Sequence, residues 1–245
     1  MYCQPLLKNL VYKCLLINQS CAICDEPAQQ RIPLCLACEG ELPWLDEQCL
    51  ICALPLPMQG LTCAQCHRRR PAFTKVEALW HYGFPIDTLI TRFKHHGQWP
   101  LGRLMAEALG NCLLHRFAED LPRPDRLLSV PMARRRLRQR GFNQADMLAR
   151  WLGTQLGIAC DDKLLQRTRD TPAQQALDAR ARQRNLRQAF SLRPEASLEG
   201  LHLALVDDVL TTGATAQALA SLLRQAGASR VDVYCLARTP KPGQA

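Results

Sequence analysis

The residues with the clearest chemical potential are eight cysteines in the first 70 positions, arranged as four Cys-x-x-Cys pairs that begin every 14 residues. The pairs are Cys21/Cys24, Cys35/Cys38, Cys49/Cys52 and Cys63/Cys66. Two intervening residues let both sulfur atoms of a pair reach one ion at about 2.3 Å, and two pairs complete a tetrahedral thiolate site. The eight sulfur atoms therefore predict two structural zinc sites, because four thiolates leave no open position for catalysis at the metal.

The spacing alone leaves the grouping of the pairs open. Consecutive pairs would give two successive zinc ribbons, at 21–38 and 49–66, and interleaved pairs would cross-link them. Disulfides are disfavoured in the cytosol, and iron–sulfur ligation is disfavoured by the even separation of the pairs. Five other cysteines are scattered and are predicted to be small buried apolar groups. They are Cys3, Cys14, Cys112, Cys160 and Cys235.

A second chemical feature follows the apolar run 203–206, where two adjacent acids, Asp207 and Asp208, precede a loop of small and hydroxyl residues. The loop consists of Thr211, Thr212, Gly213, Ala214 and Thr215. Amides at a helix N-terminus, together with threonine hydroxyls, form a phosphate cradle, and glycine lets the backbone approach the phosphate closely. The two carboxylates can accept hydrogen bonds from the cis-diol of a ribose whose 5′-phosphate occupies this cradle, with Mg²⁺ alongside.

Other phosphate motifs fit this segment less well. A Walker loop needs a lysine after its glycine, and a dinucleotide fingerprint needs G-x-G-x-x-G before the acid; the segment has neither. Helix capping by two acids is the simpler alternative. Two acids, three threonines and a glycine in this order exceed what capping requires.

The elements that must position these residues begin after Pro71, where strand-like and helical segments alternate as in an α/β domain. The predicted strands cover 75–82, 126–130, 201–206 and 230–237, and the predicted helices cover 85–93, 101–117, 144–156 and 214–226. The last strand, helix and strand form a right-handed βαβ unit. We therefore predict two domains: a double zinc-ribbon module with an amphipathic N-terminal segment at 1–70, and a parallel sheet flanked by helices at 71–245.

Charge is distributed unevenly along the chain. The formal net charge is +9, residues 1–70 balance, and arginines outnumber lysines by 25 to 6. Arginine suits bidentate contacts with phosphate, although solvated helix faces are the simpler explanation for the clusters at 133–140 and 180–193. The polar run 173–188 is predicted to be an exposed helix or a loop. An aromatic content of 6% is low for a platform that stacks single-stranded bases.

Length and composition limit the protein class. A chain of 245 residues with 47% hydrophobic and 22% charged residues accommodates a medium-sized globular domain and a small module. No apolar run approaches the roughly 18 residues that span a bilayer. The N-terminal stretch 1–17 carries Lys8 and Lys13 and lacks a signal-cleavage site. We expect a cytoplasmic protein without membrane insertion.

The segment 207–215 resembles the ribose-phosphate motif of type I phosphoribosyltransferases. Three further segments, together with the cysteine module, are similar to the ComF/GntX family of competence and DNA-utilisation proteins, and this likeness covers nearly the whole chain. The segments are Arg140-Gly141-Phe142-Asn143-Gln144, Thr171-Pro172-Ala173-Gln174 with Leu177, and Arg182-Gln183-Arg184-Asn185. The resemblance implies a type I phosphoribosyltransferase-like fold that follows the cysteine module.

The resemblance also implies roles for particular residues. Val130 and Pro131 would form the loop that faces a pyrophosphate. The other residues that would line or adjoin the pocket are Lys94, Arg140, Asn143, Gln174, Arg182 and Asn185. Ala53 stands where many relatives have a glycine after the third cysteine pair, which makes the turn there a point to examine.

Two hypotheses follow from these observations. In the first, which we favour, the protein binds phosphoribosyl pyrophosphate with Mg²⁺. Asp207 and Asp208 hold the ribose, arginines neutralise the departing pyrophosphate, and an unidentified nucleophile attacks the anomeric carbon. In the second, the same fold is a non-catalytic module that binds single-stranded DNA through its basic face and DNA-uptake or recombination proteins through its zinc ribbons.

Overall fold

The computed structural model describes residues 19–28, 33–168, 188–193 and 197–241. Gln174, Arg182 and Asn185, which the family resemblance placed in the pocket, lie outside these ranges, as does nearly all of the run 173–188. The chain divides into two compact units, Met1–Pro43 and Trp44–Ala245.

The first unit contains a short hairpin and one helical turn. Strands β1 (Gln19–Ser20) and β2 (Pro27–Ala28) pair antiparallel, and helix α2 covers Leu36–Gly40. Between the strands, the Cys21 amide donates to the Glu26 carbonyl at 2.7 Å. Asp25 adopts φ +63°, a left-handed conformation that an aspartate tolerates in a tight turn. The hairpin and the helix thus each present one cysteine pair.

The second unit begins before the third cysteine pair, whereas the sequence led us to expect a domain boundary at residue 70. Residues 44–70 contain helix α3 (Ala64–Arg68), and several of their apolar side chains, Leu45 and Ala53 among them, belong to the hydrophobic core that also contains strand residues such as Val76 and Leu205. The backbone is also joined to the sheet, since the Leu45 amide donates to the Leu79 carbonyl at 3.1 Å. The two cysteine ribbons therefore belong to different compact units.

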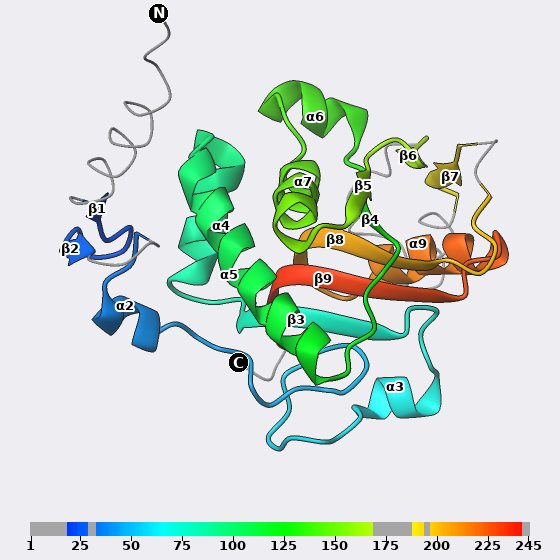
Figure 1. Cartoon of the computed structure of the whole chain (residues 1–245), viewed down its shortest axis with the longest axis horizontal. Coiled ribbons are helices and arrows are strands. Elements are labelled where there is room, and N and C mark those ends of the chain that lie inside the picture. The colour runs from blue at the N-terminus through cyan, green and yellow to red at the C-terminus, as the bar shows by residue number, and fades with distance from the viewer. Residues whose placement is uncertain (1–18, 29–32, 169–187, 194–196, 242–245) are drawn as a thin grey trace, which may run out of the picture. The chain divides into compact units, whose positions relative to one another are not determined.

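The centre of the second unit is a five-stranded parallel sheet in the order β3-β9-β8-β4-β5 (Figure 1). Its strands are β3 (Lys75–His81), β4 (Arg126–Ser129), β5 (Ala159–Asp161), β8 (His202–Leu210) and β9 (Arg230–Arg238). The central strands are covered on both faces, which explains why they read as continuous apolar runs. The predicted α/β fold and its parallel sheet are confirmed.

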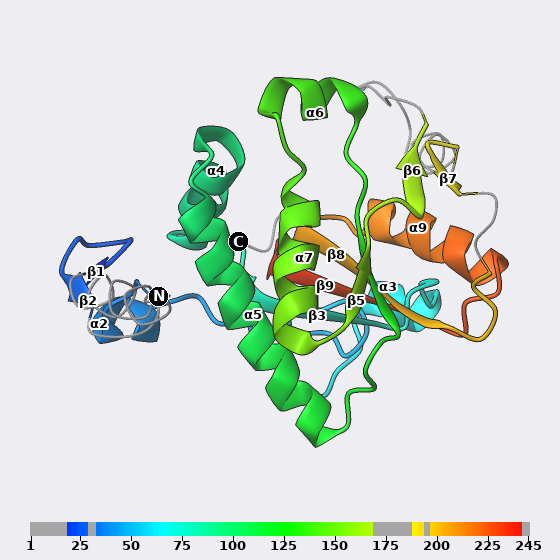
Figure 2. The ribbon, with the colours of Figure 1, turned by 45° about the horizontal axis from the view of Figure 1, so that its top comes forward.

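Helices cover both faces of this sheet (Figure 2). The helices that follow α3 are α4 (Ile86–His96), α5 (Trp99–Glu119), α6 (Arg134–Arg140), α7 (Gln144–Leu156) and α9 (Ala214–Gln225), of which α5, α7 and α9 contact the sheet. Helices α5 and α7 pack against each other and the sheet, and α9 packs against β8 and β9. A small antiparallel pair, β6 (Leu165–Arg167) and β7 (Phe190–Leu192), was not predicted. None of the helices in the described ranges is long and apolar enough to cross a membrane.

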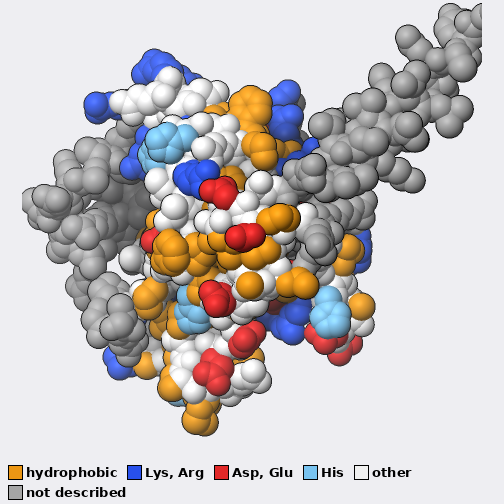
Figure 3. All heavy atoms as spheres, turned by 90° about the vertical axis from the view of Figure 1, so that its left-hand side faces the viewer, with side chains coloured by type: hydrophobic (Ala, Val, Ile, Leu, Met, Phe, Trp, Pro, Cys, Tyr) orange, Lys and Arg blue, Asp and Glu red, His pale blue; other side chains and the backbone are white. Residues whose placement is uncertain are grey.

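The arginine cluster at 133–140 forms helix α6, which the sequence analysis did not assign. Residues 134–139 are exposed and Arg140 is half-buried. Lysine and arginine side chains gather along the upper edge of the space-filling view in Figure 3, level with α6 in Figure 1. This helix is therefore a solvated, strongly basic element above the sheet.

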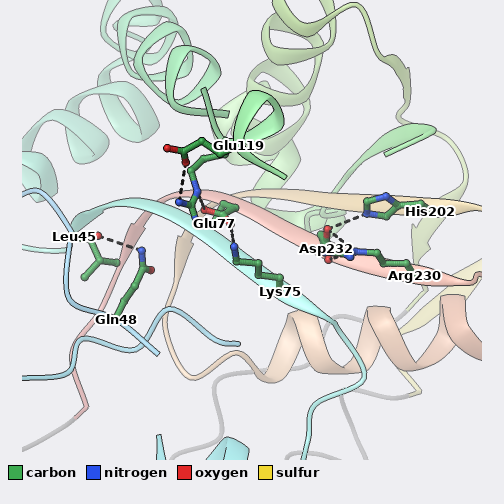
Figure 4. Close-up of polar contacts among 9 residues, drawn as sticks. Leu45, Gln48, Lys75, Glu77, Glu119, His202, Arg230 and Asp232 are labelled. Atoms are coloured by element: carbon green, nitrogen blue, oxygen red, sulfur yellow. Dashed lines mark hydrogen bonds and ion pairs between the residues drawn. The ribbon is translucent and has the colours of Figure 1, made fainter. Parts of the chain in front are cut away.

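Several buried charges lie near the amino ends of β8 and β9 (Figure 4), whereas the acidic pair lies further along β8. The Asp232 carboxylate is fully buried and contacts His202 Nε2 at 2.9 Å and Arg230 Nε at 3.0 Å. His202 Nδ1 lies 3.1 Å from the Arg123 carbonyl oxygen, so both ring nitrogens face acceptors. Because these charges are paired within the fold, they satisfy a structural requirement for buried ions.

Candidate functional site

The acidic pair lies in the last part of β8, which continues to Leu210 rather than ending at Val206 as predicted. Each carboxylate turns toward the backbone that follows it. Asp207 Oδ1 accepts from the Asp208 amide at 2.9 Å, and Asp208 Oδ1 accepts from the Val209 amide at 2.7 Å. The pair is thus fixed at the carboxyl end of a central parallel strand, where such sheets bind ligands.

Helix α4 brings Lys94 to this pair. Lys94 Nζ lies 2.7 Å from Asp208 Oδ2, and the two side chains are only 19% and 6% exposed. The resemblance placed Lys94 at the pocket, and the structure gives it a specific partner there. A half-buried cation is therefore held directly against one of the two acids.

Asp207 has a different environment from Asp208. Burial raises its pKa well above the usual range for aspartate, and the negative charge of Asp208 raises it further, while Lys94 opposes the shift. The site therefore disfavours negative charge on Asp207 in the absence of a ligand. A ligand that offers hydroxyl donors or a cation to this carboxylate would relieve that cost.

The loop after β8, which the sequence predicts to be an anion cradle, is open at its glycine. Gly213 adopts φ +74°, and apart from Gly213 and its two chain neighbours no atom of the described residues lies within 4 Å of the position that a Cβ would occupy. Thr211 and Thr212 are exposed, and Thr212 Oγ1 lies 3.4 Å from the Ala214 amide. The first helical bond runs from the Gln217 amide to the Gly213 carbonyl at 2.8 Å, so the amides of the first turn of α9 point toward the loop.

The predicted pyrophosphate loop lies beside β8 at the end of β4. The Val130 amide donates to the Val206 carbonyl at 3.0 Å, and Asn143 Nδ2 donates to the Val130 carbonyl at 3.1 Å. Asn143 also caps α7, since its Oδ1 accepts from the Ala145 amide at 3.2 Å. The family resemblance placed Asn143 in the pocket, and the structure shows that its side chain joins the loop to the start of α7.

Arg140 ends α6 and donates from Nη1 to Gln144 Oε1. Burial lowers the pKa of its guanidinium, and the charge of Asp208 acts in the opposite direction. Arg140 therefore lies within electrostatic reach of the acidic pair. Together with Lys94, it places two cations around Asp208.

A cavity of about 550 Å³ adjoins this edge of the sheet, and residues that sequence reasoning missed line it. Ser129 Oγ donates to Asp146 Oδ1 at 3.0 Å, and burial raises the pKa of Asp146. In the sequence, Asp146 looks like an ordinary acid in the first turn of a helix. Only its fold neighbours show that it faces a cavity beside Pro131 and Asn143.

The eight cysteines form two groups of four, Cys21/Cys24/Cys35/Cys38 and Cys49/Cys52/Cys63/Cys66. This result decides the open question of grouping in favour of consecutive pairs. Within each group all sulfur atoms lie within 4.8 Å of one another. Two of the distances, Cys24 to Cys35 and Cys52 to Cys63, are 3.6 and 3.7 Å. A tetrahedron with metal–sulfur bonds of about 2.3 Å has edges of about 3.8 Å, so each group could hold one zinc ion.

Backbone amides also favour thiolates in both groups. The Cys38 amide points at Cys35 Sγ at 3.4 Å, and the Cys66 amide points at Cys63 Sγ at 3.5 Å. The turn after the third pair is satisfied without glycine, because Ala53 adopts φ +53° and packs in the core. The two groups differ in exposure: only Cys21 is buried in the first, whereas all four cysteines of the second are buried.

An acidic pair and a Thr/Gly loop at the carboxyl edge of this parallel sheet are features of phosphoribosyltransferase-type domains, and residues 138–244 match the family described as "Phosphoribosyl transferase domain". The DNA utilization protein YhgH of Salmonella typhi is 36% identical over 89% of this chain and 90% of its own length. Competence protein F of Haemophilus influenzae is 32% identical over 84% of this chain and 90% of its own length. The chain therefore belongs to the ComF family, as do these two relatives.

A solved structure, the glutamine phosphoribosylpyrophosphate amidotransferase of B. subtilis, superimposes with a TM-score of 0.38 at 21% identity, over 55% of this chain and 26% of that chain.

Proposed function

We propose that this protein binds phosphoribosyl pyrophosphate at the carboxyl edge of its sheet. The observation that carries the proposal is the loop after β8, where Gly213 adopts φ +74° and opens the start of α9, directly after two buried or half-buried acids. A helix start binds a phosphate, and carboxylates bind sugar hydroxyls. The order of these groups along the chain matches the order of groups in a ribose 5-phosphate.

In this proposal each end of the ligand meets complementary chemistry. The 5′-phosphate accepts hydrogen bonds from the amides and hydroxyls of 211–215. Asp207 and Asp208 accept hydrogen bonds from the ribose hydroxyls. Lys94 and Arg140 would offset the negative charge of the pyrophosphate, and the Val130–Pro131 loop would face it. Gln174, Arg182 and Asn185 remain proposed pocket residues by family resemblance.

The donor set also suits Mg²⁺, which prefers a few carboxylate oxygens together with substrate phosphates. Asp207 would be the carboxylate available to it, because Asp208 Oδ2 already pairs with Lys94. When bound, the ion would offset the charge of the pyrophosphate. The two cysteine groups would hold one structural zinc ion each, since their four thiolates complete a closed site.

We further propose transferase turnover. A nucleophile would form a bond to the anomeric carbon, the bond from that carbon to the pyrophosphate oxygen would break, and the electron pair would leave with the pyrophosphate. Lys94 and Arg140 would stabilise the charge that develops on the leaving group. Holding the ribose between the acidic pair and the phosphate loop would supply orientation.

The relatives named for DNA utilization and competence support a role in the uptake or use of external DNA. We propose that the protein acts there in the cytoplasm, with DNA-uptake or recombination proteins as partners. A second candidate is binding of single-stranded DNA. Its support is the exposed basic helix α6, together with Phe84 and Trp99, which are 77% and 54% exposed.

Calorimetry tests the binding proposal. Purified protein is titrated with phosphoribosyl pyrophosphate, with ribose 5-phosphate and with pyrophosphate, each with and without Mg²⁺. The proposal expects saturable binding of the complete ligand that is tighter than binding of either fragment and is strengthened by Mg²⁺. Equal affinity for pyrophosphate and the complete ligand would show that the ribose and phosphate positions are wrong.

A further inference from the structure

The two cysteine groups are alike in sequence but differ in what they touch. The second group, defined by Cys49, Cys52, Cys63 and Cys66, belongs to the same hydrophobic core as Leu210 at the end of β8 and Ala216 and Leu219 of α9. The first group lies in the separate compact unit Met1–Pro43. Only the second group is therefore built into the unit that carries the phosphate loop.

Arg238, the last residue of β9, joins the second group to that loop. Its side chain is buried, at 6% exposure. Nε donates to the Cys52 carbonyl at 3.0 Å, and Nη1 donates to the Leu210 carbonyl at 3.0 Å and to the Thr211 carbonyl. One planar guanidinium thus holds the backbone of a cysteine ligand and the backbone at the start of the loop in a fixed relation.

A second connection lies on the other side of the loop. The Ala72 amide, six residues after Cys66, donates to Gln217 Oε1 at 2.8 Å. Gln217 is in the first turn of α9, where its own amide donates to the Gly213 carbonyl. The segment that contains the second group therefore contacts both the beginning of the loop, through Arg238, and its end, through Gln217.

The cysteine segment is itself fastened to the sheet. The Ile51 carbonyl accepts from the Val76 amide at 2.8 Å, next to the Cys52 carbonyl that accepts from Arg238. Cys52 and Ala53 are buried, and Ala53 adopts φ +53°. Metal binding supplies much of the folding energy of small cysteine ribbons. Loss of the metal ion should therefore destabilise this turn, because nothing else would hold the four sulfur atoms together.

We propose that Arg238 is a positioning residue through which the second cysteine group sets the conformation of the loop Leu210–Gly213. Metal bound in the second group, and not metal bound in the first, then controls anion binding at this loop. The part concerning anion binding rests on the proposed function, whereas the part concerning loop conformation does not. Arg238 does not touch the anion in this proposal. It fixes the carbonyls of Leu210 and Thr211, and the amides of the loop remain available to a ligand.

The test compares two matched cysteine variants of the full-length protein. Cys35 and Cys63 each precede a short helix and each accept an amide hydrogen bond from the next cysteine of the pair. Cys35→Ser and Cys63→Ser should each remove one zinc ion by elemental analysis. Only Cys63→Ser should raise hydrogen exchange at least tenfold in peptides covering 209–215 and weaken phosphoribosyl pyrophosphate binding at least tenfold. Equal effects of the two variants would overturn the proposal.

Arg238→Lys keeps the test decisive if Cys63→Ser unfolds the second unit. It preserves both cysteine groups and the positive charge but cannot hold the same set of carbonyls. Its control is Arg224→Lys, because Arg224 Nη1 also donates to backbone carbonyls, of Ala228 and Ser229, at the far end of α9. Exchange at 209–215 should rise at least tenfold in the first variant only, with two zinc ions retained. Unchanged exchange in Arg238→Lys would refute its positioning role.

The exchange measurement also separates this proposal from the binding proposal. If wild-type protein does not bind phosphoribosyl pyrophosphate but exchange at 209–215 still responds to Cys63→Ser alone, the proposed function fails and the link between metal and loop stands. If the wild type binds the ligand and Cys63→Ser changes neither exchange nor affinity after loss of its zinc ion, the proposed function stands and the link is refuted.

Discussion

Replacing Lys94 by methionine should destabilise the second compact unit, because it leaves the Asp208 carboxylate buried without its closest cation. The pair is separated by 2.7 Å, and its side chains are 19% and 6% exposed. Removing one partner of a buried pair typically costs about 3–5 kcal/mol, and because Arg140 still acts on Asp208 we expect a loss of about 2–3 kcal/mol here. Methionine preserves the apolar stem, so the change isolates the charge.

Urea unfolding followed by tryptophan fluorescence measures this loss. All four tryptophans, at 44, 80, 99 and 151, lie in the unit Trp44–Ala245, so the signal reports on that unit alone. Combining Lys94→Met with Asp208→Asn should recover most of the loss, since the unpaired charge is then absent.

A matched control exists on β3. Lys75 Nζ contacts Glu77 at 2.7 Å with similar burial of the carboxylate, but Glu77 also forms a second direct ion pair, with Arg116 at 3.6 Å, whereas Arg140 acts on Asp208 without such a contact among the described residues. Lys75→Met should therefore cost less than about 1 kcal/mol. If Lys94→Met costs no more than Lys75→Met, or if the double variant recovers nothing, the account of Lys94 as the required partner of Asp208 is wrong.

Three further predictions concern the loop, the metals and Asp207. Gly213→Val should lower the free energy of unfolding by about 1–2 kcal/mol through left-handed backbone strain, and calorimetry should find no binding of phosphoribosyl pyrophosphate. The control is Gly157→Val, at φ +65° with equally open space, which should lose stability but keep binding. Elemental analysis should find about two zinc ions per chain, and titration that finds eight reactive thiols in the native protein would contradict this. Asp207→Asn should weaken binding of phosphoribosyl pyrophosphate but raise the free energy of unfolding at pH 7 to 8. The pKa of Asp207 is raised in the folded protein, so the wild type loses stability as the pH rises from about 4, and asparagine removes this loss. Equal pH dependence of unfolding in the two proteins would show that Asp207 is not held in a charge-disfavouring site.

The features that sequence could predict are those determined over short distances along the chain. The 14-residue repeat of cysteine pairs indicated two four-sulfur groups because two intervening residues bring both sulfurs of a pair together. The acidic pair and Gly213 follow an apolar run, which located the carboxyl end of a buried strand. Its boundary was placed too early, since Asp207 and Asp208 continue the strand to Leu210 despite their polarity.

The features that sequence could not predict depend on contacts between distant segments. Lys94 and Asp208 meet only because the fold brings the last turn of α4 to the acidic pair of β8, and the resemblance gave Lys94 a place but no partner. The cysteine repeat suggested one module at 1–70, whereas the second group packs on the sheet and the compact units divide at Pro43. Arg238 reads as one more strand residue, and its role depends on backbone carbonyls of Cys52 and of Leu210 and Thr211, which lie far apart in the sequence.

The central claim, that Asp207 and Asp208 grip a ribose, is tested most directly by titrating the double variant Asp207→Asn/Asp208→Asn with phosphoribosyl pyrophosphate and, in parallel, with a single-stranded oligonucleotide. Hydrogen bonds to charged groups contribute roughly 1.5–3 kcal/mol each, so affinity for the sugar phosphate should fall more than about tenfold. Affinity for the oligonucleotide should stay unchanged or rise, because two negative charges are removed. Unchanged affinity for phosphoribosyl pyrophosphate in a folded double variant would contradict the assignment of the acidic pair and the transferase function built on it.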